Sequence, residues 1–357
     1  MSMLTANEIM AKIKQGDVIE QVNLQGISLV GQNLSGGRFW AVDFSDANFS
    51  HAILEESVFT ECLFEETVFN SVRCEKTLFE QCNMIRAMFN KATLSASVFD
   101  QCVLKKTQFK VTKQNSTQFS SCQLQYADFI ENEFDRATFI NSVLHYATLR
   151  NSHFFLVTFF RQDLRKTDFY ASQFMKTLFF ECDHRDQDYR KLQFQACQFT
   201  DNQLDAVNFN QSNLTHCNFK GSSLQDAQLS NVNATQALFI NADLTRAFCH
   251  NSLFNGAIFI GACLERTDFR QSQLQQAIMQ KVRAVNAQFV NCDMTYADLS
   301  YANMNNSDFR AAHFMRTLFH RTQQVGALFS DRQGILENDP ELFAAEEWST
   351  QQRQRKI

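Results

Sequence analysis

The stretch 183–192, DHRDQDYRKL, places three carboxylates, on Asp183, Asp186 and Asp188, around the imidazole of His184. Carboxylates beside a histidine can bind a divalent metal or carry out general acid–base catalysis. A single flexible segment, however, seldom holds such a group rigidly enough for catalysis. We therefore interpret this stretch as a solvated or partner-binding segment, and a metal site and catalysis remain the weaker alternatives.

The rest of the sequence contains no recognisable catalytic motif. It has no glycine-rich phosphate loop, no HExxH and no nucleophile elbow, and its eight histidines share no common spacing. The sequence therefore predicts a protein that is not an enzyme, and it predicts neither a cofactor nor a metal.

The elements that position these residues follow a repeat of five. From Leu24 to Phe319 every residue whose number ends in 4 or 9 falls on one phase, and 53 of these 60 positions are Phe, Leu or Met. We call this the central position i. The residue at i−2 is usually small, and those at i−1, i+1 and i+2 are mostly polar.

This spacing indicates a coil rather than a helix or a flat sheet. Residues i−2 and i lie on the same face of an extended segment, which we expect to point inward. The next inward residue comes three positions after i, so the chain must turn a corner at i+1 and i+2. A helix would need apolar residues every 3.6 positions.

The repeats YADFI, NADLT and YADLSYANMNNSDF resemble the A(D/N)LXX signature of the bacterial pentapeptide repeat proteins. This resemblance implies an all-β fold, a right-handed quadrilateral parallel β-helix with four pentapeptides per coil and about 15 coils. Eight of the eleven cysteines occupy the small i−2 position, and four of them (Cys62, Cys82, Cys102 and Cys122) are 20 residues apart. We interpret them as core filling rather than as metal ligands or disulfides.

Three regions are expected along the chain. Residues 1–21 are a capping helix and lead-in, because Thr5 and Glu8 form a capping box. Residues 22–321 are the β-helix. Residues 322–357 hold a second helix that begins after Asp339, and its apolar residues are Leu342, Phe343 and Trp348. These three are candidates for a homodimer interface, as the resemblance implies, or for a cap on their own coil.

Two segments break the repeat. Gln114 occupies a central position in residues 110–118, and His184 and Tyr189 occupy two successive central positions in residues 183–192. Burying such groups without partners costs several kcal/mol, on the order of 2–7 per polar group. The sequence therefore predicts that both segments project outward as loops.

A candidate surface for a protein partner lies next to the second segment. Ile140, Phe160 and Phe180 are 20 residues apart at i+1, which predicts an outward ladder of apolar side chains. The candidate partner-binding residues are Phe155, Phe160, Phe180, His184, Arg185, Asp186, Tyr189 and Arg190.

Charge and composition indicate which classes of partner and which location to expect for the protein. A formal net charge of −5 gives no attraction to nucleic acid, so no direct nucleic-acid partner is expected. No apolar run is long enough for a membrane span, and no secretory signal is visible at the N-terminus. A cytoplasmic bacterial location with reduced thiols is expected, and delivery by a specialised secretion system is also compatible.

Two functions remain. The first is a non-enzymatic scaffold for protein–protein interaction, and the opening residues resemble those of pentapeptide proteins found with secretion systems. The second is mimicry of DNA to bind DNA gyrase or topoisomerase IV, which the resemblance to the family suggests. Nine acidic residues between Asp43 and Cys82 favour mimicry over a short length, but 33 basic residues offset the 38 acidic residues of the whole chain.

Overall fold

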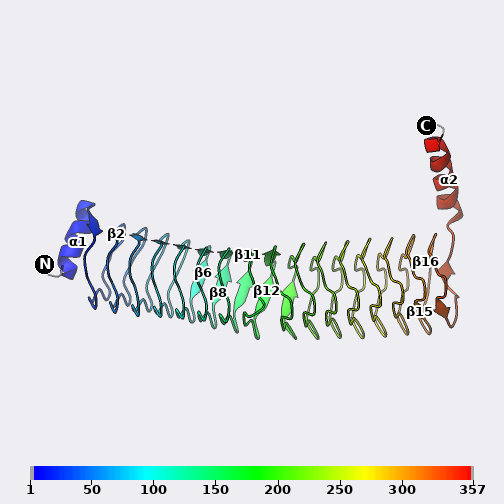
Figure 1. Ribbon diagram of the computed structural model, residues 1–357, viewed down its shortest axis with the longest axis horizontal. Helices are drawn as coiled ribbons and strands as arrows, with labels where there is room; N and C mark the ends of the chain where they lie inside the picture. Colours follow the sequence, from blue (N-terminus) through cyan, green and yellow to red (C-terminus); the bar gives the residue numbers. More distant parts are fainter. Residues whose placement is uncertain (1–3, 355–357) are drawn as a thin grey trace. The chain divides into compact units, whose positions relative to one another are not determined.

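The computed structural model describes residues 4–354 and divides into two units, Met1–Gln198 and Phe199–Ile357. Each unit is a parallel β-solenoid, and the chain makes about 16 turns in all, with a short helix near each terminus (Figure 1). The predicted all-β parallel β-helix with terminal helices is therefore confirmed.

Unit 1 contains one helix, α1 (Ala6–Gln15), and fourteen short strands. The strands are β1 Val18–Glu20, β2 Arg38–Trp40, β3 Val58–Thr60, β4 Leu78–Glu80, β5 Val98–Asp100, β6 Lys113–Asn115, β7 Gln118–Ser120, β8 Glu133–Asp135, β9 Thr138–Ile140, β10 His153–Phe155, β11 Thr158–Phe160, β12 Gln173–Met175, β13 Leu178–Phe180 and β14 Gln193–Gln195. They form a nine-stranded sheet in the order β1-β2-β3-β4-β5-β7-β9-β11-β13 and a five-stranded sheet in the order β14-β12-β10-β8-β6.

Unit 2 is built mostly from isolated parallel bridges between residues 20 apart, such as Asn208 with Gln228. Its named elements come near its end: β15 Asp308–Phe309, β16 Thr317–Leu318, β17 Leu328–Phe329, β18 Ile335–Leu336 and α2 (Pro340–Gln354).

A register of exactly one coil relates the strands, because every pairing within the sheets of unit 1 joins residues 20 positions apart, as Phe39 with Phe59. We number the four faces of unit 1 in chain order. Face 1 carries the nine-stranded sheet and has central positions 19–179. Face 2 has central positions 24–184, face 3 has 29–189, and face 4 has 34–194 and carries the five-stranded sheet.

The corners explain the polar part of the repeat. The chain turns after each central residue. At many of these corners the amide of residue i+3 donates to the carbonyl of residue i, as Ala47 does to Phe44 at 3.0 Å. An Asp or Asn at i−1 accepts from the amide at i+1, as Asp43 does from Ser45 at 2.9 Å. The residue at i+2 has a φ near 50–60°, as in Asp46, a conformation that Asn, Asp and Gly tolerate best.

The core is a set of stacked aromatic columns. The rings of Phe39 and Phe59 stack with centroids 4.7 Å apart, and Phe44 meets Phe39 edge to face at 5.5 Å. Such pairs add about 0.5–1.5 kcal/mol each beyond the burial of their area. The repeat of Phe at one phase therefore supplies the main stabilisation within each unit.

The small i−2 residues hold the coils together from inside. Ser57 Oγ donates to the carbonyl of Leu34, 23 residues earlier, at 2.7 Å. Cys82 Sγ lies 3.4 Å from the carbonyl of Phe59 in the equivalent place. All eleven cysteines are free thiols, and ten of them are buried. Burial raises the pKa of the Cys182 thiol to about 12, so this thiol stays protonated and behaves as a weakly polar core group.

Helix α1 begins and ends, and helix α2 begins, at the residues that the sequence predicts. Thr5 and Glu8 form the expected capping box of α1, Gly16 closes it in the left-handed conformation, and Ile9 is buried. Asp339 Oδ1 accepts from the amides of Glu341 and Leu342 at the start of α2.

The prediction of projecting loops at 110–118 and 183–192 is wrong. Gln114 lies in β6, pairs in register with Phe134 of β8 and is buried. Asp183 bridges Asp163 in the regular 20-residue register, and His184 is fully buried. The physical reason is that these polar side chains keep hydrogen bonds inside the coil, which offset part of the desolvation cost. Gln114 Nε2 donates to Thr112 Oγ1 at 3.0 Å, while Gln114 Oε1 has no hydrogen-bond partner among the described residues.

Candidate partner-binding site

A group of exposed and half-buried apolar side chains of unit 1 lies over three successive coils. We call this set the apolar patch; its members are Ile140, Phe155, Leu156, Phe160, Met175, Leu178 and Phe180. On face 1, Phe160 of β11 pairs with Ile140 of β9 on one side and with Phe180 of β13 on the other. The predicted ladder of Ile140, Phe160 and Phe180 is therefore present in the sheet.

The two rings of the ladder pack on one another, with Phe180 exposed and Phe160 half-buried. Phe160 and Phe180 stack with centroids 5.6 Å apart and an angle of 10°. The guanidinium of Arg161 lies 4.8 Å from the centre of the Phe160 ring and also binds Glu181 at 2.6 Å. The ladder thus has a charged border on the corner between faces 1 and 2.

The patch continues around the corner onto face 4. Phe155 of β10 pairs with Met175 of β12, and Leu156 occupies the corner between faces 4 and 1 with a φ of 54°. Phe155, Leu156, Met175, Leu178 and Phe180 are each 39–43% exposed. Exposed apolar clusters of this kind mark sites of protein interaction more often than isolated apolar residues do.

Met175 and Leu178 were not among the residues predicted for the site. A signal for both exists in the sequence. Met175 follows Phe155 by one coil at the same i+1 position, and Leu178 is two residues from Phe180 and therefore points to the same side of the strand.

His184 and Tyr189, predicted to contact a partner, are instead core residues with 0% and 1% exposure. Their side chains meet inside the coil, where His184 Nδ1 lies 2.7 Å from the Tyr189 hydroxyl. The histidine ring also packs edge to face on Phe179 at 5.1 Å. Burial lowers the pKa of His184 to about 3 and raises the pKa of Tyr189 well above its usual value. The imidazole is therefore neutral and can accept the tyrosine hydroxyl proton as a hydrogen bond.

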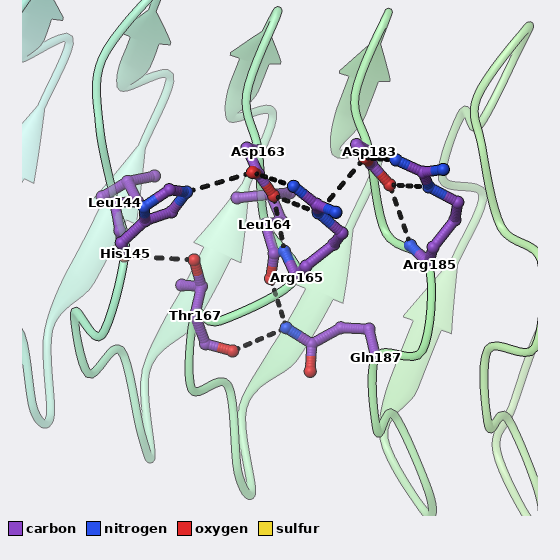
Figure 2. A network of polar contacts seen from close by, with 9 residues as sticks. All are labelled: Leu144, His145, Asp163, Leu164, Arg165, Thr167, Asp183, Arg185 and Gln187. Carbon is purple, nitrogen blue, oxygen red and sulfur yellow. Dashed lines mark hydrogen bonds and ion pairs between the residues drawn. The ribbon is translucent and has the colours of Figure 1, made fainter.

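Gln187 takes the i−2 position that a small residue usually occupies. Its Nε2 donates to the carbonyls of Leu164 and Thr167, the second at 2.7 Å, and its Oε1 accepts from the amide of Asp188 at 3.0 Å (Figure 2). The longer amide thus makes the same contact with the carbonyl 23 residues earlier that Ser and Thr make elsewhere.

The carboxylates of the 183–192 stretch bind arginines on the surface. On face 2, His145, Asp163, Arg165, Asp183 and Arg185 form one ladder (Figure 2). Arg165 reaches Asp163 at 2.8 Å and Asp183 at 3.2 Å. The hydrogen bond from Arg165 holds the pKa of Asp163 well below its usual range. These acids are therefore ionised and paired, which does not suit a general acid.

The structure separates the other candidate residues of this stretch from the apolar patch. Arg185 lies on face 2, and Asp186 is the exposed corner between faces 2 and 3. Arg190 lies on face 3 and binds Asp188 at 2.7 Å. Of the eight predicted residues, Phe155, Phe160 and Phe180 are brought together in one patch.

In unit 2 the apolar residues of α2 remain largely open to solvent. Leu342, Phe343 and Trp348 are 41%, 37% and 65% exposed. The helix contacts its unit through Arg321, which binds Glu346 at 2.6 Å and lies 4.4 Å from the centre of the Phe343 ring. The helix therefore does not bury these three side chains on its own coil, and their role in a dimer stays a prediction.

Metal-binding groups and membrane-spanning helices would indicate other functions. Within residues 4–354, no three or more His, Cys, Asp or Glu side chains are grouped so that they could hold a metal ion. Neither helix in that range has the length and apolar character that crossing a membrane requires.

Comparison with protein families finds two matching sequence models. One, described as "Pentapeptide repeat region", matches residues 32–109 and 72–149, and the other, described as "Pentapeptide repeats (8 copies)", matches four segments between residues 203 and 331. Together these matches cover more than half of the chain. A comparison with curated protein sequences finds no significant match.

Solved structures of the same repeat type also match. HetL, a pentapeptide repeat protein involved in heterocyst differentiation regulation in the cyanobacterium Nostoc, is 16% identical, with 88% of this chain and 96% of that chain covered and a TM-score of 0.20. QnrB1, a plasmid-mediated fluoroquinolone resistance protein, is 14% identical, with 88% and 95% covered and a TM-score of 0.14. A pentapeptide repeat protein from the thylakoid lumen of Arabidopsis thaliana is 23% identical, with 27% and 67% covered and a TM-score of 0.26.

Proposed function

The chain belongs to the pentapeptide repeat family, and from this premise we propose that it is a non-enzymatic scaffold that binds a protein partner through the apolar patch. The observation that carries the proposal is that five exposed apolar side chains and two half-buried ones, Ile140 and Phe160, lie together on faces 4 and 1 and the corner between them. Solenoid coils hold such side chains at fixed spacing, so a partner meets a pre-formed surface and little ordering entropy is lost on binding.

The test is partner capture from the native host with the purified protein and two matched variants. Phe160→Asp/Phe180→Asp places two charges in the centre of the patch. Val58→Asp/Val98→Asp places the same charges on outward residues of β3 and β5 in the same sheet. We expect the first variant to capture at least tenfold less partner than the wild type and the second to capture as much as the wild type. The reason is that buried unpaired carboxylates strongly oppose association.

Equal capture by the wild type and Phe160→Asp/Phe180→Asp would contradict the patch as the binding surface. Equal loss in both variants would mean that the substitutions act on the sheet rather than on a local site. Far-UV circular dichroism of each variant checks that the coils remain folded.

DNA mimicry is the second candidate, and the acidic coils between Asp43 and Cys82 favour it. Basic residues offset part of this charge, because Glu56 pairs with Lys76 at 3.2 Å and Arg86 pairs with both Glu65 and Glu66. A gyrase supercoiling assay, with and without a quinolone, tests this candidate. An absence of both inhibition and protection would exclude it.

Association with a secretion system is a finer form of the scaffold proposal. It is supported by the resemblance of the opening residues, and it predicts that the captured partner is a component or cargo of such a system. Identification of that partner by mass spectrometry in the capture experiment tests it.

A further inference from the structure

A second surface of unit 1, distinct from the apolar patch, is concave and rich in cations. The concavity has a volume of about 600 Å³ and lies across face 3 between the corner at Lys166 and the corner at Lys191. Five of its lining residues are cationic and two are acidic. The residues that carry the argument are Arg150, Lys166, Tyr170, Arg190 and Lys191, with the acids Asp168 and Asp188 between them.

The cations divide into two groups according to their partners. Arg150 binds Asp168 at 2.5 Å, and Arg190 binds Asp188 at 2.7 Å, so each arginine is neutralised and held in place. Among the described residues, no carboxylate oxygen lies within 4.0 Å of the ammonium of Lys166 or Lys191. The two lysines are therefore the charges that remain available for an external anion.

The backbone at this place differs from every other corner. From residue 21 to residue 326 the i+2 residues have positive φ, except Lys166. The amide of Tyr146 bonds the carbonyl of Lys166 at 2.9 Å, whereas the equivalent amide of Tyr126 bonds the i+1 residue of the next coil, His145. Gln187 bonds the carbonyls on both sides of this turn. The break in the repeat at 183–192 thus reshapes the corner that borders the concavity.

The aromatic residue in the concavity is strongly exposed. Tyr170 is 70% exposed, and the guanidinium of Arg150 lies 5.7 Å from the centre of its ring. The ring and the arginine together present an amphipathic wall between the two lysines. Such a wall accommodates the methylene groups of a side chain whose end is charged.

The chemistry of the lining favours the carboxylates of a peptide over the denser charge of duplex nucleic acid. Duplex nucleic acid carries about one charge per 1.7 Å, and the carboxylates of Asp168 and Asp188 inside the concavity would repel such a chain. Glutamate or aspartate side chains can instead approach the two lysines one at a time.

We propose that this concavity binds an acidic segment of a protein, with carboxylates at Lys166 and Lys191 and an aliphatic or aromatic side chain against Tyr170. The inference rests on the proposed function in one respect, since we expect the acidic segment to belong to the partner that occupies the apolar patch. The coils around residues 150–191 carry both surfaces, so one partner that spans faces 3, 4 and 1 would meet cations first and apolar side chains next.

The test uses the full chain and a fluorescent hexaglutamate peptide, with binding measured by fluorescence anisotropy at low salt and at 0.5 M NaCl. Lys166→Glu/Lys191→Glu reverses the two available charges. Lys105→Glu/Lys106→Glu makes the same change in net charge on face 2, outside the concavity. We expect hexaglutamate to bind the wild type, binding to weaken at least tenfold in the first variant, and the second variant to stay within about threefold of the wild type, since exposed charges at a distance are screened.

Three outcomes would overturn the proposal. They are an absence of hexaglutamate binding to the wild type at low salt, an equal loss in both charge-reversed variants, and tighter binding of oligothymidylate than of hexaglutamate with the same dependence on Lys166 and Lys191. Neutral variants, Lys166→Gln/Lys191→Gln, with unchanged thermal unfolding show that any loss comes from charge rather than from misfolding.

Phe160→Asp/Phe180→Asp separates this proposal from the proposed function. If that variant both binds hexaglutamate and captures the partner, the proposal that the apolar patch binds the partner fails and the proposed anion site stands. If it loses the partner while the wild type does not bind hexaglutamate, the scaffold proposal stands and the anion site fails.

Discussion

At His184 and Tyr189 two polar residues replace the Phe or Leu of the repeat and remain in the core. Their burial is tolerated in part because the tyrosine hydroxyl and Nδ1 of the neutral imidazole form one hydrogen bond at 2.7 Å. An isolated histidine at the same place would bury a polar group without such a partner, at a cost of about 1–3 kcal/mol. The pairing makes the core of unit 1 sensitive to pH, since protonation would place a charge where no water reaches.

We predict that unit 1 loses stability as the pH falls below the pKa of an unfolded histidine. The folded pKa of His184 is about 3, below the ordinary histidine value of 6.5, so the unfolded state binds the proton first. The free energy of unfolding should fall by about 1.4 kcal/mol for each pH unit from 6.5 toward 3. Urea unfolding at pH 7.5, 5.5 and 4.5, followed by circular dichroism, measures this.

The matched variant is His184→Phe/Tyr189→Phe, which restores the usual residue at both central positions. The free energy of unfolding of this variant should lack the contribution of His184 to the pH dependence, while the other titrating groups contribute as in the wild type. Parallel pH profiles for the wild type and the variant would show that His184 does not titrate on unfolding.

Among the elements, the corners carry the local strain of the solenoid. Each corner with an L-residue at positive φ costs on the order of 1–2 kcal/mol, and Lys106 with a φ of 60° is one example. The strain persists because each corner also makes parallel backbone bonds to the next coil, as the amide of Lys106 does to the carbonyl of Gln125 at 3.0 Å. Lys166 is the exception, because its φ is not positive.

Glycine substitution should therefore act differently at two lysines in equivalent positions. Lys106→Gly is expected to leave stability unchanged or to raise it by up to about 1 kcal/mol, because glycine adopts the left-handed conformation without strain. Lys166→Gly is expected to lower stability by about 0.5–1 kcal/mol, because it relieves no strain and adds chain entropy to the unfolded state. Thermal unfolding of the two variants compares them directly, and an equal effect at both sites would contradict the difference in backbone conformation.

For the whole molecule, the ends of the solenoid matter because they carry edges that a folded chain must cover. At the start of unit 1, α1 buries Ile9 and contacts β1. In unit 2, α2 leaves Leu342, Phe343 and Trp348 exposed, and Val325 and Leu328 of the final coils are also exposed. These five apolar side chains of unit 2 are therefore open to contact with another protein surface.

We predict that the protein is a homodimer through this C-terminal surface. Size-exclusion chromatography with light scattering should give a dimer for the wild type and a monomer for Leu342→Glu/Trp348→Glu, because a charge at each apolar contact opposes association. Val111→Glu, at an exposed corner of unit 1, is the matched control and should remain dimeric. A wild type that stays monomeric at about 100 μM would contradict the prediction.

The fold could be predicted from the sequence because inward and outward positions repeat with period five. Each residue's place follows from its phase, so 53 apolar central residues were enough to identify the coil and its corners. The apolar ladder of Ile140, Phe160 and Phe180 was predictable for the same reason, since a spacing of 20 makes residues lateral neighbours.

The tertiary structure decided the features that the five-residue period of the sequence does not specify. Whether His184 and Tyr189 leave the core or pair within it depends on two side chains from adjacent faces that meet only once the coil closes. The concavity beside Lys166 depends on Gln187 bonding carbonyls in the preceding coil, 20 and 23 residues earlier. Repetition in the sequence therefore determined the architecture, because backbone pairing is periodic, while contacts between non-equivalent side chains determined where that architecture changes and which surfaces it offers to a partner.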